Sequence, residues 1–185
     1  MRILYLLTQV PFPPDNGFKH RYTNLLRDLA SRNEVAVACF AAPDDELRGG
    51  EAFTSEFVSF NYVRLPSSIP TSYPQGWLSS DPSEVRFLAS SPMAELVDRL
   101  VARHEPEVIV VGDPALTQYV EKHDSAPRVL DYMCDAILGF KRLGDVSFGP
   151  GKWVNTLRAK KYARFLWRIS RHYVRCFSSS LEVRH

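Results

Sequence analysis

Residues 2–31 have the sequence RILYLLTQVPFPPDNGFKHRYTNLLRDLAS, and this stretch decides the fold. Residues 3–7 are almost all apolar, a pattern typical of a strand that is buried on both faces of a parallel sheet. Pro11, Pro13 and Pro14 fit neither a central strand nor a helix interior, so the chain must leave the sheet as a loop. The stretch therefore predicts a buried strand followed by a long loop.

A helix is predicted to follow this loop from Phe18 onward. Asp15 or Asn16 suits the N-cap, and Gly17 is free to adopt a positive φ. Apolar residues then recur at helical spacing, at Tyr22, Leu25, Leu26 and Leu29. The N-terminus of this helix points back over the sheet edge, where free backbone N–H groups and the helix dipole favour an anion. We therefore expect a ligand-binding corner here.

The rest of the chain alternates apolar strands with amphipathic helices. Further strands are predicted at 34–41, 57–65, 108–111, 128–131 and 173–177. Helices are predicted from Pro92 to His104, at 115–123 and at 153–171, with a short helical turn at 43–51, an irregular connection at 66–82 and a glycine-bearing loop at 139–151. This order predicts an α/β fold with a Rossmann-like, doubly wound parallel sheet. Ligands should lie beyond the carboxyl ends of its strands, near residues 8–21, 112–115 and 131–135.

Composition limits the classes of protein that fit. The 185 residues, 45% hydrophobic and 12% aromatic, are enough for one domain with a packed core. The net charge of +2 gives no indication of a nucleic-acid partner, and no apolar run is long enough to span a membrane. Cys39, Cys134 and Cys176 form no zinc or CxxC pattern, which predicts reduced thiols and a cytoplasmic protein.

Several chemical motifs are absent from the sequence. There is no GxGxxG or Walker A loop for a dinucleotide or nucleotide, no GxSxG elbow, no HExxH and no DxD. The five histidines are scattered along the chain. We therefore predict neither a metal site nor a cofactor.

The helix predicted at 153–171 is basic, and no Asp or Glu occurs from Val146 to Leu181. Arginines recur in it and just beyond it at i, i+4, i+7 and i+11, which predicts one common face: Arg164, Arg168, Arg171 and Arg175. Two interpretations stay open. The arginines belong to an ordinary surface helix, or they contact anionic lipid at a membrane surface.

With these residues in view, the chain resembles the N-terminal domain of glycosyltransferase family 4-like enzymes, which are two-domain sugar transferases of the GT-B architecture. The opening strand, the PFPPDNG loop and the segment FKHRYTNLLRDLASRNEVAVACF carry the resemblance, and PEVIVVGDPALTQYV, RVLDYMCDA and ARFLWRISRHYVRCFSSSLE support it. The nearest subset in pattern is the sugar transferases of exopolysaccharide-type gene clusters. Two features depart from the family. Phe18 replaces a glycine or small polar residue, and Trp167 and Val174 stand where acidic residues are usual.

The resemblance implies that residues 1–185 form one acceptor-side domain of a retaining, metal-independent transferase, without the C-terminal domain that binds most of the nucleotide-sugar. It also implies a glycan or lipid-linked acceptor, and a protein that can lie on the inner face of the cell membrane. The alternative is a non-catalytic α/β module that docks to a membrane or a protein. A flavodoxin-like protein that binds a phosphate ligand is a third hypothesis.

The resemblance also assigns provisional roles to the corner residues. Asn16, Gly17, Phe18, Lys19, His20 and Arg21 would face the donor diphosphate, although Gly17 also suits a capping turn and the basic residues also suit a solvated face. Asp113 would line the acceptor pocket or cap a helix. Asp131 and Asp135 would bind a sugar hydroxyl or act as a base, and a capping role is equally open.

Overall fold

The computed structural model describes residues 1–42, 51–65, 81–132 and 136–178. Its strands are β1 (Arg2–Leu7), β2 (Glu34–Ala41), β3 (Ser59–Arg64), β4 (Val108–Val111), β5 (Arg128–Tyr132) and β6 (Arg175–Ser178). They form one sheet in the order β3-β2-β1-β4-β5-β6, and every neighbouring pair is parallel. The predicted α/β Rossmann-like sheet is confirmed. Its strand order reverses between β1 and β4, which is the topological switch point.

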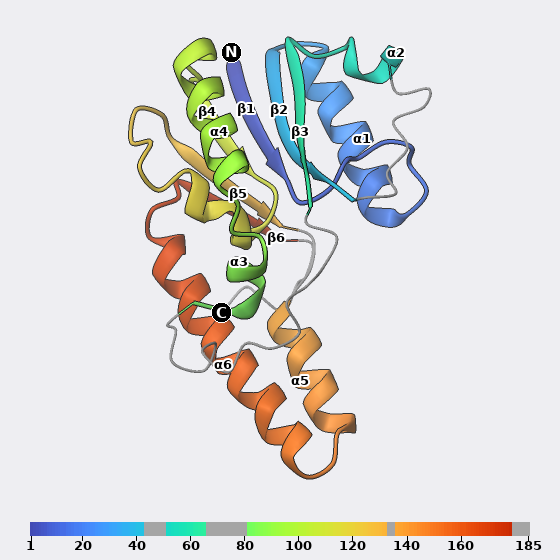
Figure 1. Ribbon diagram of the computed structural model, residues 1–185, viewed down its shortest axis with the longest axis vertical. Coiled ribbons are helices and arrows are strands. Elements are labelled where there is room, and N and C mark those ends of the chain that lie inside the picture. The colour runs from blue at the N-terminus through green and yellow to red at the C-terminus, as the bar shows by residue number, and fades with distance from the viewer. Residues whose placement is uncertain (43–50, 66–80, 133–135, 179–185) are drawn as a thin grey trace.

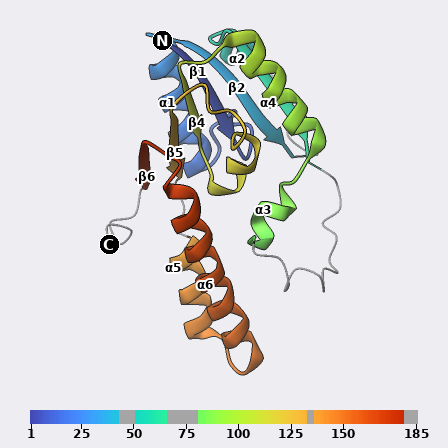
Figure 2. The same ribbon diagram turned by 90° about the vertical axis from the view of Figure 1, so that its left-hand side faces the viewer.

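Helices cover both faces of the sheet (Figures 1 and 2). On one face α1 (Gly17–Ala30) and α2 (Glu51–Thr54) pack over Ile3, Tyr5 and Leu7. On the other face α3 (Ser83–Phe87), α4 (Ser91–His104), the 3-10 helix η2 (Pro114–Tyr119) and the end of α6 (Pro150–Ser170) pack over Leu4 and Leu6. Alternate residues of β1 enter opposite cores because side chains alternate along a strand. This explains why the opening strand is apolar at nearly every position.

Three expectations about the helices differ from the structure. The predicted helix at 115–123 is instead the shorter η2, and α3 has no counterpart among the predictions. The predicted glycine loop is wrong over much of its length because Gly139 and Gly144 lie inside α5 (Ala136–Val146). Packing against α6, where the Phe140 and Tyr162 ring centroids lie 6.2 Å apart, outweighs the low helix propensity of glycine. Most of 43–51 and 66–82 lies outside the described residues.

The common face expected for the four arginines is also wrong in one respect. Helix α6 ends at Ser170, so Arg171 is its C-cap and Arg175 opens β6. The N–H of Val174 donates to the carbonyl of Arg128, and this bond draws the chain into the sheet. Strand pairing therefore removes Arg175 from the helical face.

Helices α5 and α6 form a hairpin that extends beyond the carboxyl ends of the strands, away from the sheet (Figures 1 and 2). The upper end of α6 enters the core through Phe165 and Ile169. The lower end, together with α5, projects into solvent.

Candidate functional site

The exits of β1, β4 and β5 lie side by side at the carboxyl edge of the sheet. We use the name switch corner for the residues at these exits, which are the first turns of α1 together with Gly112, Asp113 and Asp131. The N–H of Gly112 donates to the carbonyl of Leu6 at 2.8 Å. A Cβ atom at Gly112 would lie 2.8 Å from Leu7 Cδ2 and 2.9 Å from Leu6 O, so a larger residue cannot fit without displacement. Glycine therefore allows the β4 exit to lie directly against β1.

Asp131 binds helix α1 to the sheet. Its Oδ1 accepts from Arg21 Nη2 at 2.6 Å, and its Oδ2 accepts from the Tyr5 hydroxyl at 2.8 Å. The Asp131 side chain is only 7% exposed, so both carboxylate oxygens are occupied in a nearly dry site. The predicted base thus has a structural ion pair, and any catalytic role for it stays a prediction.

Tyr22, which follows Arg21 in α1, also belongs to this hydrogen-bond network. Its hydroxyl lies 3.2 Å from the carbonyl oxygens of both Gly112 and Asp131, and Arg21 Nη1 donates to it at 3.1 Å. Burial, reinforced by the charge of Asp131, raises the pKa of both Tyr5 and Tyr22 well above the usual tyrosine value. Both hydroxyls therefore stay protonated and act as hydrogen-bond donors. No sequence signal marks these two tyrosines as site residues, because in an apolar strand and helix pattern they are indistinguishable from core residues.

The N-terminus of α1 is capped by Asn16, whose Oδ1 accepts from the N–H of Lys19 at 3.0 Å. Gly17 does not use the positive φ that is open to a glycine, because extended Asn16 makes the turn and Gly17 is already the first helical residue. A Cβ atom at Gly17 would meet nothing within 4 Å. In the described part of the chain, the N–H groups of Gly17 and Phe18 reach no acceptor. They are open to a ligand.

The side chains of the predicted donor segment diverge. Lys19 is buried, with Nζ 3.2 Å from Asp15 Oδ2, and Arg21 turns inward to Asp131. Phe18 is half-buried against the ring of Tyr22, at a centroid distance of 4.4 Å. His20 is exposed. A ligand at this turn would therefore meet mainly backbone N–H groups, because the Lys19 and Arg21 side chains already pair with carboxylates of the protein.

Asp113 caps η2, and its Oδ1 accepts from the N–H of Ala115 at 2.7 Å. The capping interpretation is confirmed, while the acceptor role stays a prediction. Burial raises the pKa of Asp113 to about 6; the hydrogen bond from Ala115 opposes this shift and the charge of Glu84 adds to it. The residue retains partial exposure, and no hydrogen bond to Oδ2 is found within the described segments. Asp113 can therefore exchange a proton near neutral pH.

The other predicted residues lie elsewhere. Asp135 is outside the described residues. Arg164 is exposed, Arg168 pairs with Asp81, and the guanidinium of Arg171 lies 3.5 Å from the centroid of the Trp167 ring. No described helix is long and apolar enough to cross a membrane, and the described residues contain no group of three His, Cys, Asp or Glu that could hold a metal ion.

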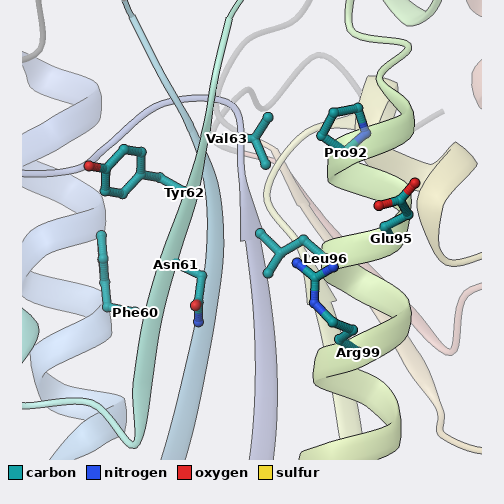
Figure 3. A pocket seen from close by; sticks show the side chains of 8 residues that line it. All are labelled: Phe60, Asn61, Tyr62, Val63, Pro92, Glu95, Leu96 and Arg99. Carbon is teal, nitrogen blue, oxygen red and sulfur yellow. The ribbon is translucent and has the colours of Figure 1, made fainter.

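A hollow of about 350 Å³ lies between edge strand β3 and helix α4 (Figure 3). Its lining includes Tyr62 and Val63 from the strand and Glu95 and Arg99 from the helix. Strands β2 and β1 separate it from β4 and the switch corner. No motif in the sequence indicates this hollow. Its lining carries one acidic and one basic side chain, so it favours neither an anionic nor a cationic ligand.

Comparison with known proteins identifies a class of fold. No protein-family model and no curated protein matches the sequence. Among solved structures, the chain is similar to Phytolacca americana UGT2 complexed with UDP-2fluoro-glucose and pterostilbene: the TM-score is 0.52 and the identity 14%, over 97% of this chain and 48% of that one. The apo form of UGT2 gives a TM-score of 0.52 and 12% identity, over 98% of this chain and 46% of that one.

These neighbours are glycosyltransferases of the GT-B architecture, and the chain spans about half their length. The chain therefore has an α/β, Rossmann-like fold of the kind found in GT-B enzymes. Membership of family 4 and the exopolysaccharide subset stay predictions.

Proposed function

We propose that the chain is the N-terminal, acceptor-side domain of a family 4-like, exopolysaccharide-type glycosyltransferase. The enzyme would be retaining and metal-independent, and would transfer sugar from a nucleotide-diphosphate donor to a glycan or lipid-linked acceptor at the cytoplasmic face of the membrane. One observation carries the proposal. Free N–H groups at Gly17 and Phe18, and the titratable carboxylate of Asp113, occur together at the switch point of a sheet with a GT-B-like fold.

The donor-facing share of this site is the first turn of α1. Its free N–H groups and the helix dipole favour the negative charge of a departing diphosphate. Asp15 opposes this attraction, although Lys19 compensates its charge at 3.2 Å. The turn has little net positive charge, so this domain alone should hold a nucleotide-sugar weakly, with most donor contacts supplied by a second domain.

The acceptor-facing share is Asp113. A carboxylate with a pKa of about 6 can accept a hydrogen bond from a sugar hydroxyl and take up its proton near neutral pH. Asp131 is less available, because a substrate would first have to displace Arg21 or Tyr5 from it. We therefore favour Asp113 over Asp131 for acceptor contact.

Gly17→Ala tests the donor share, with Gly139→Ala as the matched control. Both glycines are helical, and a Cβ atom at either position meets nothing within 4 Å. Calorimetric titration of the unmodified chain with UDP-glucose should give a dissociation constant in the millimolar range. This corresponds to a binding free energy of about −4 kcal/mol. Gly17→Ala should weaken binding by about tenfold, because its methyl group blocks approach to one or two N–H donors. Gly139→Ala should bind as the unmodified chain does.

Two results would contradict the proposal. Equal binding by the chain and by Gly17→Ala would remove α1 from the donor site. Micromolar binding by the unmodified chain would contradict the division of the donor site between two domains.

A further inference from the structure

The free end of the α5–α6 hairpin exposes large apolar side chains. We define the hairpin tip as residues 143–157. Within it Phe148 is 94% exposed, Trp153 74% and Val146 72%, and Leu143 and Leu157 are about half exposed. An apolar hollow of about 480 Å³ lies beside Trp153 and Leu157. Exposed apolar side chains gathered within one short stretch of a surface mark an interaction site.

The backbone of the tip is well defined. Gly149 has a φ of 59°, a conformation that favours glycine, and Pro150 then starts α6 at the position proline prefers. A Cβ atom at Gly144 would lie 3.7 Å from Asn155 Cβ, an ordinary packing distance, so the two helices lie in contact at this point and alanine would also fit there. The loop that joins α5 and α6 lies at the end of the hairpin that is farthest from the sheet (Figure 1).

The charge around the tip has one dominant sign. Asp145 is the single acidic residue from 136 to 178. The basic residues in the tip and beside it are exposed: Lys141, Arg142, Lys152, Arg158 and Lys160. Of these, Arg158 pairs with Glu84 at 2.9 Å. On α6 the exposed face carries Trp153 and Leu157 first, and then Lys160 and Arg164 at i+7 and i+11 from Trp153. An apolar end is therefore followed by a basic band.

The spacing of these two zones matches the edge of a lipid bilayer. At 1.5 Å per residue, the segment of α6 from Pro150 to Leu157, which carries Trp153 and Leu157 beside the exposed Lys152, is about 10 Å long. Interfacial helices bury their apolar face roughly 5–10 Å into the boundary between headgroups and acyl chains. Aromatic residues favour this boundary, and basic residues just above it favour anionic headgroups.

We propose that the hairpin tip docks the protein on an anionic lipid bilayer, with Phe148 and Trp153 inserted and the basic band at the headgroups. A second copy of the chain would bring two basic bands together, which is unfavourable. Nucleic acid would leave the aliphatic side chains of Leu143, Val146 and Leu157 without a partner. The surface differs from the four-arginine face expected from the sequence, since Arg168 and Arg171 already have contacts on the protein.

Vesicle co-sedimentation of the full chain tests this proposal without any sugar ligand, so its outcome is independent of the transferase assignment. The chain should bind vesicles of phosphatidylcholine with about one third phosphatidylglycerol, and bind pure phosphatidylcholine much less. The double variant Phe148→Ala/Trp153→Ala should lower the partition coefficient by at least about tenfold. Lys160→Gln/Arg164→Gln should lower binding to the anionic vesicles by roughly tenfold. Added salt should also weaken binding of the unmodified chain, because it screens the attraction between basic side chains and anionic headgroups.

Trp167→Ala is the matched control, because Trp167 is an exposed tryptophan on the same helix but lies beyond the basic band. It should bind as the unmodified chain does, and circular dichroism should show that all variants are folded. Two outcomes would overturn the proposal: no vesicle binding, or equal loss of binding in Trp167→Ala and the tip variant. If vesicle binding is absent and light scattering shows a dimer that the tip variant abolishes, the tip binds a second copy of the chain instead.

Discussion

The switch corner and the hairpin tip use similar residues in opposite ways. In the switch corner, Arg21 and Lys19 turn inward and meet Asp131 and Asp15, and two tyrosine hydroxyls find acceptors. At the hairpin tip, Phe148 and Trp153 point into solvent, and the neighbouring basic residues are exposed. The first region therefore uses its side chains for stability and offers mainly backbone groups to a ligand. The second contributes little to stability and keeps its side chains for a partner.

Among substitutions in the switch corner, removing the Asp131 carboxylate should have the largest effect on stability. Asp131→Ala leaves Arg21 and the Tyr5 hydroxyl without their partner in a nearly dry site. Because Arg21 is one third exposed, we expect a loss of about 3 kcal/mol in the free energy of unfolding, at the low end for a buried pair. Urea denaturation measures it. The control Asp28→Ala, on the helix that carries Arg21, breaks an exposed pair with Arg32 and should cost less than about 0.5 kcal/mol. Equal losses would contradict the structural role of Asp131.

Asp113 should give the switch corner a pH dependence. Its pKa of about 6 in the folded protein is above the value of an unfolded aspartate, so the folded state binds the proton more tightly. Stability from this group is present below pH 4 and is lost as the pH rises through 6. Between pH 4 and 7 the chain should lose about 2 kcal/mol relative to Asp113→Asn, which keeps the cap. Parallel pH profiles of urea denaturation would contradict this expectation.

Two glycine substitutions should separate packing from ligand access. Gly112→Ala places a Cβ atom against Leu6 O and Leu7 Cδ2 and should cost about 1.5 kcal/mol. Gly17→Ala meets open space in a helix and should stabilise the chain by about 0.5 kcal/mol. Thermal unfolding of both variants gives the comparison. A destabilised Gly17→Ala would show that this glycine has a conformational role instead of a binding role.

The smallest effect on stability is expected at the hairpin tip. Phe148→Ser removes a side chain that is 94% exposed and should change the free energy of unfolding by less than about 0.5 kcal/mol. Phe165→Ala, on the buried side of α6, should cost about 3 kcal/mol or more. Denaturant titration distinguishes them. A large loss for Phe148→Ser would indicate that the tip packs on the protein and is not a free docking surface.

Much of the fold could be predicted because its signals are local. Apolar runs at 34–41 and 108–111 match β2 and β4, and the cap at Asn16 places the start of α1. Helix α5 was missed because its stability comes from packing on α6, which no local propensity reveals. The strand predicted at 173–177 matches β6, so the helical face expected for Arg175 conflicted with a strand signal in the same residues.

The place of the candidate site in the fold could be predicted, but the directions and partners of its side chains could not. Strand ends locate Gly17, Asp113 and Asp131 at one edge of the sheet. The partners of Asp131 come from β1 and α1, more than a hundred residues earlier, so its engagement could not be inferred from its surroundings in the sequence. The exposure of Phe148 and Trp153 also depends on the hairpin packing.

The most direct test of the central claim is a nuclear magnetic resonance titration of the ¹⁵N-labelled chain with UDP-glucose, following every backbone amide. The switch corner, as the wall of a nucleotide-sugar site, should show the largest shifts at Gly17 and Phe18, with further shifts at Gly112 and Asp113. Shifts confined to the hollow between β3 and α4, or no shifts at millimolar ligand, would contradict the account.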